Sequence, residues 1–294
     1  MNTSMYSPPR RWPRRSRRAL RAIAMTATLS VTACALDGGP DDPANDDELV
    51  ISEAEQPLVV NRSVQVGVRC QQEYQNNWQV DVGNNDVWNQ CGWFANKIGT
   101  HERLGYYYNL HGASPAFHEP DTCGCPCGYV DAVDLFYMVT HGGADQYQAF
   151  WSMWDQLRWA TTAFMRLGDS GRRNMIFATY SCDTHAPDGF TWTRWINAFR
   201  GGLVTTVGGG GLLYAGTPQT GTDFAQRLIN GQSVKNAWLE STWYANDWNT
   251  PAQINTGVNA NDCYARSNVH LDNLFGTPIL RDNAIGFMCW VWWN

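Results

Sequence analysis

The sequence predicts an α/β fold whose central sheet is mostly parallel. Two short apolar runs, residues 133–140 and 175–181, are rich in β-branched and aromatic side chains, and each is followed by a turn signal. Runs of this length and composition are typical of strands that are buried on both faces of a sheet. From residue 133 onward such strands alternate with segments of helical periodicity, which indicates strand–helix–strand units and a parallel sheet.

Local patterns place the other elements in order along the chain. Residues 64–68 and 106–108 predict two strands ahead of residue 133, and Asp86 is placed to cap a helix over residues 87–98. Further on, we expect helices over residues 191–199, 223–229 and 233–244, and strands over residues 203–207 and 287–293. Three segments are less regular: residues 147–159 fit a strand or a helix, residues 161–167 fit a short helix or a loop, and the Asn-rich residues 258–278 are expected to form a loop.

The first 33 residues resemble a bacterial export signal. They contain seven arginines and no acidic residue, followed by a modest apolar stretch over residues 22–33 that is too short to span a membrane. Small residues then precede Cys34, an arrangement that resembles a lipobox and implies cleavage before Cys34 and lipid attachment to its thiol. An ordinary signal peptide with a chance cysteine is the alternative. We expect a lipoprotein of the outer membrane or cell surface, or a secreted protein.

Charge and composition divide the rest of the chain at residue 60. The whole sequence has a formal net charge of −6, and loss of the arginine-rich signal leaves −13. Residues 34–59 hold many acidic residues with Gly and Pro, which is typical of a disordered tether. Residues 60–294 are expected to form one domain. No segment is basic enough to follow nucleic acid, and no later stretch is apolar for long enough to span a membrane.

Cysteine usage allows two interpretations. Eight cysteines remain after Cys34, and an exported chain is expected to form disulfides. These are Cys70, Cys91, Cys123, Cys125, Cys127, Cys182, Cys263 and Cys289. The cluster at residues 123–127 lacks the paired Cys-x2-Cys spacing of zinc sites, so we expect disulfides from it to distant partners such as Cys70, Cys91 or Cys263, with no metal and no cofactor.

Two reactive residues follow the two apolar runs. His141 comes directly after the first run and Cys182 directly after the second. Neighbouring strands lie about 4.8 Å apart, and open α/β sheets build their sites at the carboxyl ends of strands. The sequence therefore predicts a Cys–His hydrolase site, unless Cys182 is a disulfide partner or a buried thiol and His141-Gly142 is a plain turn.

Other hydrolase signatures are missing from the sequence. It has no Gly-x-Ser-x-Gly elbow, since Gly168-Asp169-Ser170-Gly171 has the wrong spacing, and it has no His-Glu-x-x-His zinc helix. A papain-like enzyme would place its cysteine near the mature N-terminus with the histidine far downstream, whereas here the histidine comes first.

The order and spacing of the two residues resemble the caspase-like superfamily of cysteine peptidases, which includes caspases, metacaspases, legumains and gingipains. The resemblance rests on an apolar block ending in His141-Gly142 and a second block ending in Ser181-Cys182, separated by 41 residues. It implies a three-layer sandwich in which a mostly parallel sheet is flanked by helices. It also implies that the backbone N–H groups of Gly142 and Cys182 form an oxyanion hole.

In this hypothesis Cys182 is the nucleophile and His141 is the general acid and base. The N-terminus of the helix near Thr191 is expected to help stabilise the thiolate. His111, followed by Gly112, is a rival base. His185 is expected to be a loop residue that could also contact the site, and Asp183 is either a determinant for basic substrates or merely solvated.

Two classes of function therefore compete. The first is a tethered endopeptidase that acts as a monomer on a protein or peptide substrate. The second is a catalytically inactive surface lipoprotein that binds a protein or a glycan, with its tryptophans used for stacking. The glycine run at residues 208–211 would let backbone approach a ligand closely, but no Lys-Ser/Thr follows it, so it is not a phosphate loop.

Overall fold

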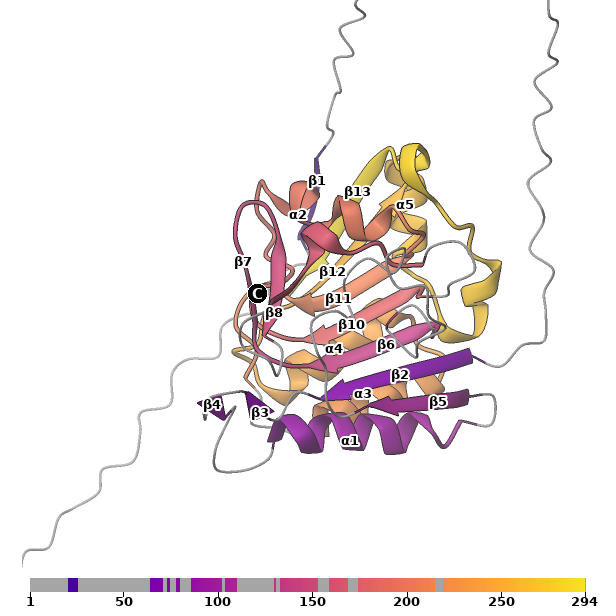
Figure 1. Ribbon diagram of the computed structural model, residues 1–294. Coiled ribbons are helices and arrows are strands. Elements are labelled where there is room, and N and C mark those ends of the chain that lie inside the picture. The colour runs from indigo at the N-terminus through magenta and orange to yellow at the C-terminus, as the bar shows by residue number, and fades with distance from the viewer. Residues whose placement is uncertain are drawn as a thin grey trace, which may run out of the picture.

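The computed structural model (Figure 1) describes residues 21–25, 64–70, 73–74, 78–79, 86–101, 104–109, 130, 133–152, 159–168, 174–214 and 219–293. Its centre is an eight-stranded sheet. The strands in spatial order are β1 (Arg21–Met25), β13 (Phe287–Trp292), β12 (Pro251–Gly257), β11 (Thr205–Gly209), β10 (Ile176–Tyr180), β6 (Leu135–Val139), β2 (Val64–Cys70) and β5 (Leu104–Asn109). A small separate hairpin pairs β3 (Glu73–Tyr74) with β4 (Trp78–Gln79).

Five neighbouring strands run parallel, as the alternation of strands and helices predicts. They are β5, β2, β6, β10 and β11. Every residue of β6 and β10 is buried, which explains why these two strands are apolar except at Thr179 of β10. β12 and β13 then add antiparallel to their neighbours. The result is a mixed α/β fold with a mostly parallel sheet flanked by helices.

The order of the parallel strands places the carboxyl ends where a site can form. Across the sheet the five parallel strands lie in the order β5, β2, β6, β10 and β11. The chain therefore adds β5 on one side of β2 and then β6, β10 and β11 on its other side, so the direction of strand addition reverses between β2 and β6. Sheets of this kind bind ligands beyond the carboxyl ends of their strands, near such a reversal. The carboxyl ends of β6 and β10 lie at this side of the sheet, next to the reversal (Figure 1).

One face of the sheet is covered by three helices. These are α1 (Asp86–Ile98), α3 (Gln219–Ile229) and α4 (Val234–Ala245), and their apolar side chains form one core with Leu135, Tyr137, Ile176 and Val207 of the sheet. A Cβ on Gly221 would lie 2.0 Å from the Gln90 carbonyl oxygen, so only glycine allows α1 and α3 to approach this closely.

The other face is covered by α2 (Thr191–Phe199) and a second, smaller sheet. That sheet joins β7 (Gly142–Ala144), β8 (Ala149–Ser152) and β9 (Trp159–Thr161). Trp151 of β8 and Trp195 of α2 are fully buried and lie edge to face with ring centroids 5.8 Å apart. The tryptophan stripe of α2 is therefore core, as its helical spacing predicts. A short 3-10 turn, η4 (Thr162–Phe164), follows β9.

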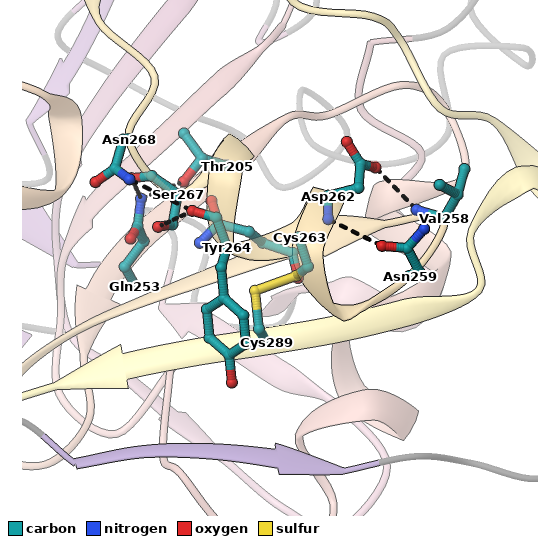
Figure 2. The surroundings of a disulfide bond; sticks show 11 residues. Thr205, Gln253, Val258, Asn259, Asp262, Cys263, Tyr264, Ser267, Asn268 and Cys289 are labelled. Atoms are coloured by element: carbon teal, nitrogen blue, oxygen red, sulfur yellow. Dashed lines mark hydrogen bonds between the residues drawn. A yellow bond between two sulfur atoms is a disulfide. The ribbon is translucent and has the colours of Figure 1, made fainter.

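The expectation of a loop over residues 258–278 is wrong. This stretch contains α5 (Ala260–Arg266) and the 3-10 segment η5 (Leu271–Gly276), followed later by η6 (Asp282–Ala284). Figure 2 shows why α5 begins where it does: the Asn259 side chain accepts a hydrogen bond from the Asp262 amide at 3.0 Å, and the Asp262 carboxylate accepts one from the Val258 amide at 2.9 Å. This reciprocal cap satisfies amides at the helix start.

A disulfide ties α5 to the sheet. Cys263 of α5 bonds to Cys289 of β13 (Figure 2), and both residues are fully buried. Cys91 of α1 is also disulfide-bonded. The expectation that Cys263 would bond to the cysteine cluster at residues 123–127 is therefore wrong.

Several predicted features lie outside the described residues. They are Cys34, the acidic tether at residues 34–59, His111, Gly112 and the cysteine cluster at residues 123–127. β1 lies inside the segment predicted to be an export signal and pairs with β13. Cleavage before Cys34 would remove β1 and leave β13 as an edge of the sheet.

Candidate active site

His141 and Cys182 follow neighbouring parallel strands at the same edge of the sheet. The register pairs Val139 of β6 with Tyr180 of β10, and the Thr140 amide donates to the Tyr180 carbonyl at 3.3 Å. β6 and β10 end at this pair, and His141 and Cys182 each stand two residues beyond it. Adjacent strands lie about 4.8 Å apart, so the two predicted residues follow the ends of neighbouring strands.

The rows of side chains that precede the two predicted residues lie on one face of the sheet. Tyr137 and Val139 of β6 belong to the core under α1, α3 and α4, as do Ala178 and Tyr180 of β10. Cys182 packs against this same core.

Cys182 is a free, half-buried thiol, so it is not a disulfide partner. Its sulfur lies 3.4 Å from the amide nitrogen of Leu213 and 3.6 Å from the carbonyl oxygen of the same residue. Burial raises the pKa of the Cys182 thiol, the Leu213 amide opposes this, and the negative charge of Asp183 adds to the rise. The thiol therefore rests in its neutral form at neutral pH.

The two hydrogen-bond contacts of the Cys182 thiol go to Leu213, and the expected help from the start of α2 at Thr191 stays a prediction. The buried side chains of α2 lie in the core of the opposite face, with Trp151 and Phe177, while Cys182 packs against the core under α1, α3 and α4. α2 supports the turn after Cys182, since Trp195 Nε1 donates to the Thr184 carbonyl at 3.0 Å.

Asp183 holds an unusual backbone conformation directly after the thiol. Its φ is 55°, the only positive value among the non-glycine residues that the structure describes. Asp tolerates this left-handed region better than most residues, and its amide donates to the Gly211 carbonyl at 2.9 Å. Such conformations concentrate at functional sites, where the surrounding structure holds them in place.

His141 is exposed at the end of β6. Partial removal of water from its ring lowers the pKa of the imidazole, so its neutral form dominates at neutral pH. Its carbonyl accepts a hydrogen bond from the Ser152 amide at 2.9 Å, which ties the residue to β8. A neutral imidazole has a ring nitrogen that is able to accept a proton.

Gly142 brings the histidine segment against the cysteine segment. A Cβ at this position would lie 2.6 Å from Thr184 Cγ2 and 2.8 Å from Ser181 Cβ, closer than real Cβ contacts allow. Only glycine therefore permits this approach between the His141-Gly142 pair and the turn that carries Cys182. The packing independently places the two segments side by side.

His185 is not a simple loop residue. Its ring is fully buried against Trp195 at a centroid distance of 4.6 Å, and its two nitrogens bond to Thr184 Oγ1 at 3.0 Å and Thr206 Oγ1 at 2.9 Å. Burial lowers the pKa of His185 to about 3. Thus His185 is a neutral anchor for the turn after Cys182.

The first two glycines of the run at residues 208–211 are packed against other parts of the protein and leave no space for a ligand. A Cβ on Gly208 would lie 2.2 Å from His185 Nδ1, and one on Gly209 would lie 2.5 Å from the Ser181 carbonyl oxygen. The interpretation of these two glycines as a ligand cradle is therefore wrong. Gly210 and Gly211 are partly exposed, and Gly211 accepts the Asp183 amide.

The sequence does not predict the segment that covers Cys182. Tyr180 donates its hydroxyl to the Tyr214 carbonyl at 2.7 Å and accepts a hydrogen bond from Asn249 at 3.1 Å. Asn249 in turn accepts from the Tyr214 amide at 2.7 Å. These contacts join three segments whose bonded residues are 34 to 69 positions apart, so no local sequence pattern predicts them.

Within the described residues, no group of three or more His, Cys, Asp or Glu side chains is arranged to hold a metal ion. None of the described helices is long and apolar enough to cross a membrane.

A family model matches residues 73–294, which is most of the chain. The protein belongs to the DUF6345 family. The description of that family is "Domain of unknown function (DUF6345)". No curated protein sequence matches the chain.

Among solved structures, the chain of this DUF6345 protein is similar to the crystal structure of the Drosophila initiator caspase Dronc. The sequence identity is 10%, the TM-score is 0.40, and the match covers 85% of this chain and 98% of that chain.

Proposed function

We propose that this DUF6345 protein is a cysteine endopeptidase with a caspase-like fold, in which His141 and Cys182 form the catalytic dyad. One observation carries the proposal: a free thiol and a histidine whose pKa is lowered follow the carboxyl ends of two adjacent parallel strands, which are paired as far as Val139 and Tyr180. The carboxyl ends of the strands are where open α/β sheets place their sites.

The protonation states favour a neutral pair in the resting site. Burial raises the pKa of Cys182 and lowers the pKa of His141, so neither group carries charge at neutral pH. His141 then acts as a general base that takes the thiol proton as sulfur attacks. A preformed ion pair is not required for this step.

The chemistry proceeds in two stages. Cys182 Sγ adds to the substrate carbonyl carbon while His141 takes its proton, and the carbonyl electrons move to oxygen. Collapse of this oxyanion breaks the C–N bond, and protonated His141 gives its proton to the leaving amine. A water molecule, deprotonated by His141, then adds to the thioester and releases the acid and the thiol.

The oxyanion formed in each stage needs donors that are already in place. We propose the backbone N–H groups of Gly142 and Cys182 for this role. The absence of a side chain at Gly142 supports it, because the backbone there lies close to the Ser181–Thr184 turn. A Cβ at this position would also crowd the substrate carbonyl.

We propose that the protein works outside the cytoplasm, as a cell-envelope lipoprotein anchored through Cys34. The Cys263–Cys289 disulfide supports an oxidising compartment. In that setting, a cysteine that stays free among bonded cysteines at the candidate site is consistent with a reactive role.

The decisive experiment compares cleavage of a peptide library by the wild type and by the variants Cys182→Ala and His141→Ala. Both variants are expected to lose cleavage. The matched control is His270→Ala, since His270 bonds to the Gly231 carbonyl at the turn between α3 and α4 and not to the site. Unchanged cleavage in Cys182→Ala would reassign the nucleophile, and unchanged cleavage in His141→Ala would reassign the base.

A second candidate, an inactive lipoprotein that binds a glycan, is favoured by a surface region elsewhere. This region is a shallow, open depression of about 240 Å³ between α1 and α3. It is lined by Trp93, Asn96, Lys97, Thr100 and Thr222, a tryptophan ring among polar groups that suits sugar stacking and hydrogen bonding. Oligosaccharide binding that Trp93→Ala abolishes, together with no cleavage of any peptide, would favour this function.

A further inference from the structure

Two segments lie side by side next to Cys182. Residues 212–214 follow β11, and residues 248–250 directly precede β12. The Thr250 amide donates to the Leu212 carbonyl at 3.2 Å, and the Tyr214 amide donates to Asn249 Oδ1 at 2.7 Å. These two bonds hold the segments together as one surface.

This surface exposes three large apolar side chains. Leu212 is 52% exposed, Tyr214 is 43% exposed and Trp248 is 75% exposed. We call these three residues the apolar shelf. Single exposed apolar residues are ordinary, but several on adjoining segments mark a binding surface. Residues 210–214 and 248–250 carry no charged side chain, and the exposed Asp247 directly precedes Trp248. The shelf residues themselves therefore suit an uncharged group, whereas Asp247 would oppose an acidic one.

The shelf is fixed relative to the candidate nucleophile. Leu213, between two shelf residues, contacts Cys182 Sγ with its amide and with its carbonyl. Tyr180, two residues before Cys182, bonds to the Tyr214 carbonyl at 2.7 Å and to Asn249 at 3.1 Å. Both segments of the shelf are therefore bonded to the strand that ends at the thiol.

We propose that the apolar shelf receives an apolar or aromatic side chain of the substrate and thereby sets the specificity of the site. The proposal rests on the peptidase function proposed above. A peptide that reaches Cys182 must pass the Leu213 backbone, where flanking side chains meet Leu212, Tyr214 or Trp248. Burial of an aromatic or branched side chain there removes apolar surface of both partners from water.

The test measures kcat/KM on a peptide library in which one position at a time is apolar, aromatic, acidic or basic. The wild type is expected to prefer apolar and aromatic residues at one position. Trp248→Ala and Tyr214→Ala are each expected to lower kcat/KM for those peptides roughly ten-fold or more, and to affect charged peptides less. Both side chains are exposed, so the variants are expected to fold.

Tyr244→Ala is the matched control. Tyr244 is 70% exposed on α4, and its ring lies 5.9 Å from the Arg227 guanidinium rather than on the shelf. Its removal is expected to leave the library profile unchanged. Alkylation of Cys182 by iodoacetamide provides a second readout, because this small reagent does not need the shelf, and its rate is expected to be the same in all three variants.

The outcomes separate the two proposals. If Cys182→Ala still cleaves, the peptidase proposal fails and the shelf proposal fails with it. If cleavage depends on Cys182 but the library shows no apolar preference, only the shelf is overturned. A preference that survives both Trp248→Ala and Tyr214→Ala also overturns the shelf alone.

Discussion

Cys182 and Leu213 make a two-way contact, in which the thiol sulfur lies 3.4 Å from the Leu213 amide nitrogen and 3.6 Å from the Leu213 carbonyl oxygen. The amide favours a thiolate, whereas the carbonyl accepts only from a protonated thiol. Burial outweighs the amide, so the pKa of Cys182 lies above its usual value. The resting thiol is therefore protonated and bonded to the segment that carries the apolar shelf.

The first prediction concerns Asp183, whose charge contributes to the raised pKa of Cys182. Asp183→Asn removes that charge, and Asn also tolerates the positive φ at this position. The pKa of Cys182 is expected to fall, which speeds alkylation by iodoacetamide at pH 7.5. The increase is expected to stay below about ten-fold, since one pKa unit is a factor of ten in thiolate fraction.

The alkylation rate is measured as a function of pH by mass spectrometry of the Cys182 peptide. Asp272→Asn in η5 is the control and is expected to follow the wild-type profile. A profile for Asp183→Asn that coincides with the wild type would show that this carboxylate does not act on the thiol.

The second prediction is a pH dependence of stability from His185. Its pKa is about 3 in the folded state and near 6.5 in the unfolded chain, so the unfolded state binds more protons between these values. The stability from His185 is complete above pH 6.5. It is lost as pH falls toward 3, at up to about 1.4 kcal/mol per pH unit.

The variant His185→Gln keeps hydrogen-bonding groups near Thr184 and Thr206 but has no charge to gain. Its free energy of unfolding in urea is expected to depend less on pH between 7 and 4 than that of the wild type. His270→Gln should retain the wild-type slope. Parallel curves for His185→Gln and the wild type would mean that the imidazole is not buried in neutral form.

The elements that the sequence predicts are those whose apolar residues recur with the spacing of one kind of secondary structure. Residues of β6 and β10 are apolar except Thr179, because both faces of the sheet are covered, and α2 shows its buried stripe at helical spacing. β12 was not predicted. Its buried residues include Gln253, whose side-chain amide donates hydrogen bonds to Thr205 and to the Ser267 carbonyl. Because several of its buried side chains are polar, this strand lacks the apolar run by which a core strand is predicted from sequence.

The candidate site also contains a part that the sequence predicts and a part that it does not. The position of His141 and Cys182 at the carboxyl ends of the strands is predicted by where the two apolar runs end, because parallel strands bring their carboxyl ends to the same side of the sheet. The contacts of Leu213 and Asn249 depend on how a loop folds back over β10, which local sequence does not encode. Likewise, the role of Gly208 appears only when His185 is seen to occupy the space above it.

The third prediction tests the close approach at Gly142. In Gly142→Ala the new Cβ would lie 2.6 Å from Thr184 Cγ2 and 2.8 Å from Ser181 Cβ. The overlap is expected to lower the free energy of unfolding by about 1–3 kcal/mol, as overpacking does elsewhere. Gly189→Ala is the control, because no atom lies within 4 Å of its Cβ position. Equal unfolding midpoints for the two variants in urea would contradict the packing of Gly142 against the Cys182 turn.

The last prediction concerns the disulfide between Cys263 and Cys289. It closes a loop with a sequence separation of 26 residues, and a loop of that length is worth about 3 kcal/mol through restriction of the unfolded chain. Cys263→Ser, Cys289→Ser and the double variant are therefore expected to lose similar stability, with the unfolding midpoint in urea as the measure. α5 and β13 pack on each other around this bond, so the single variants also leave a polar group in an apolar cluster. Because the bond lies away from the Cys182 turn, alkylation of Cys182 in the folded variants is expected to keep its wild-type rate. A change in that rate would mean that α5 is coupled to the candidate site.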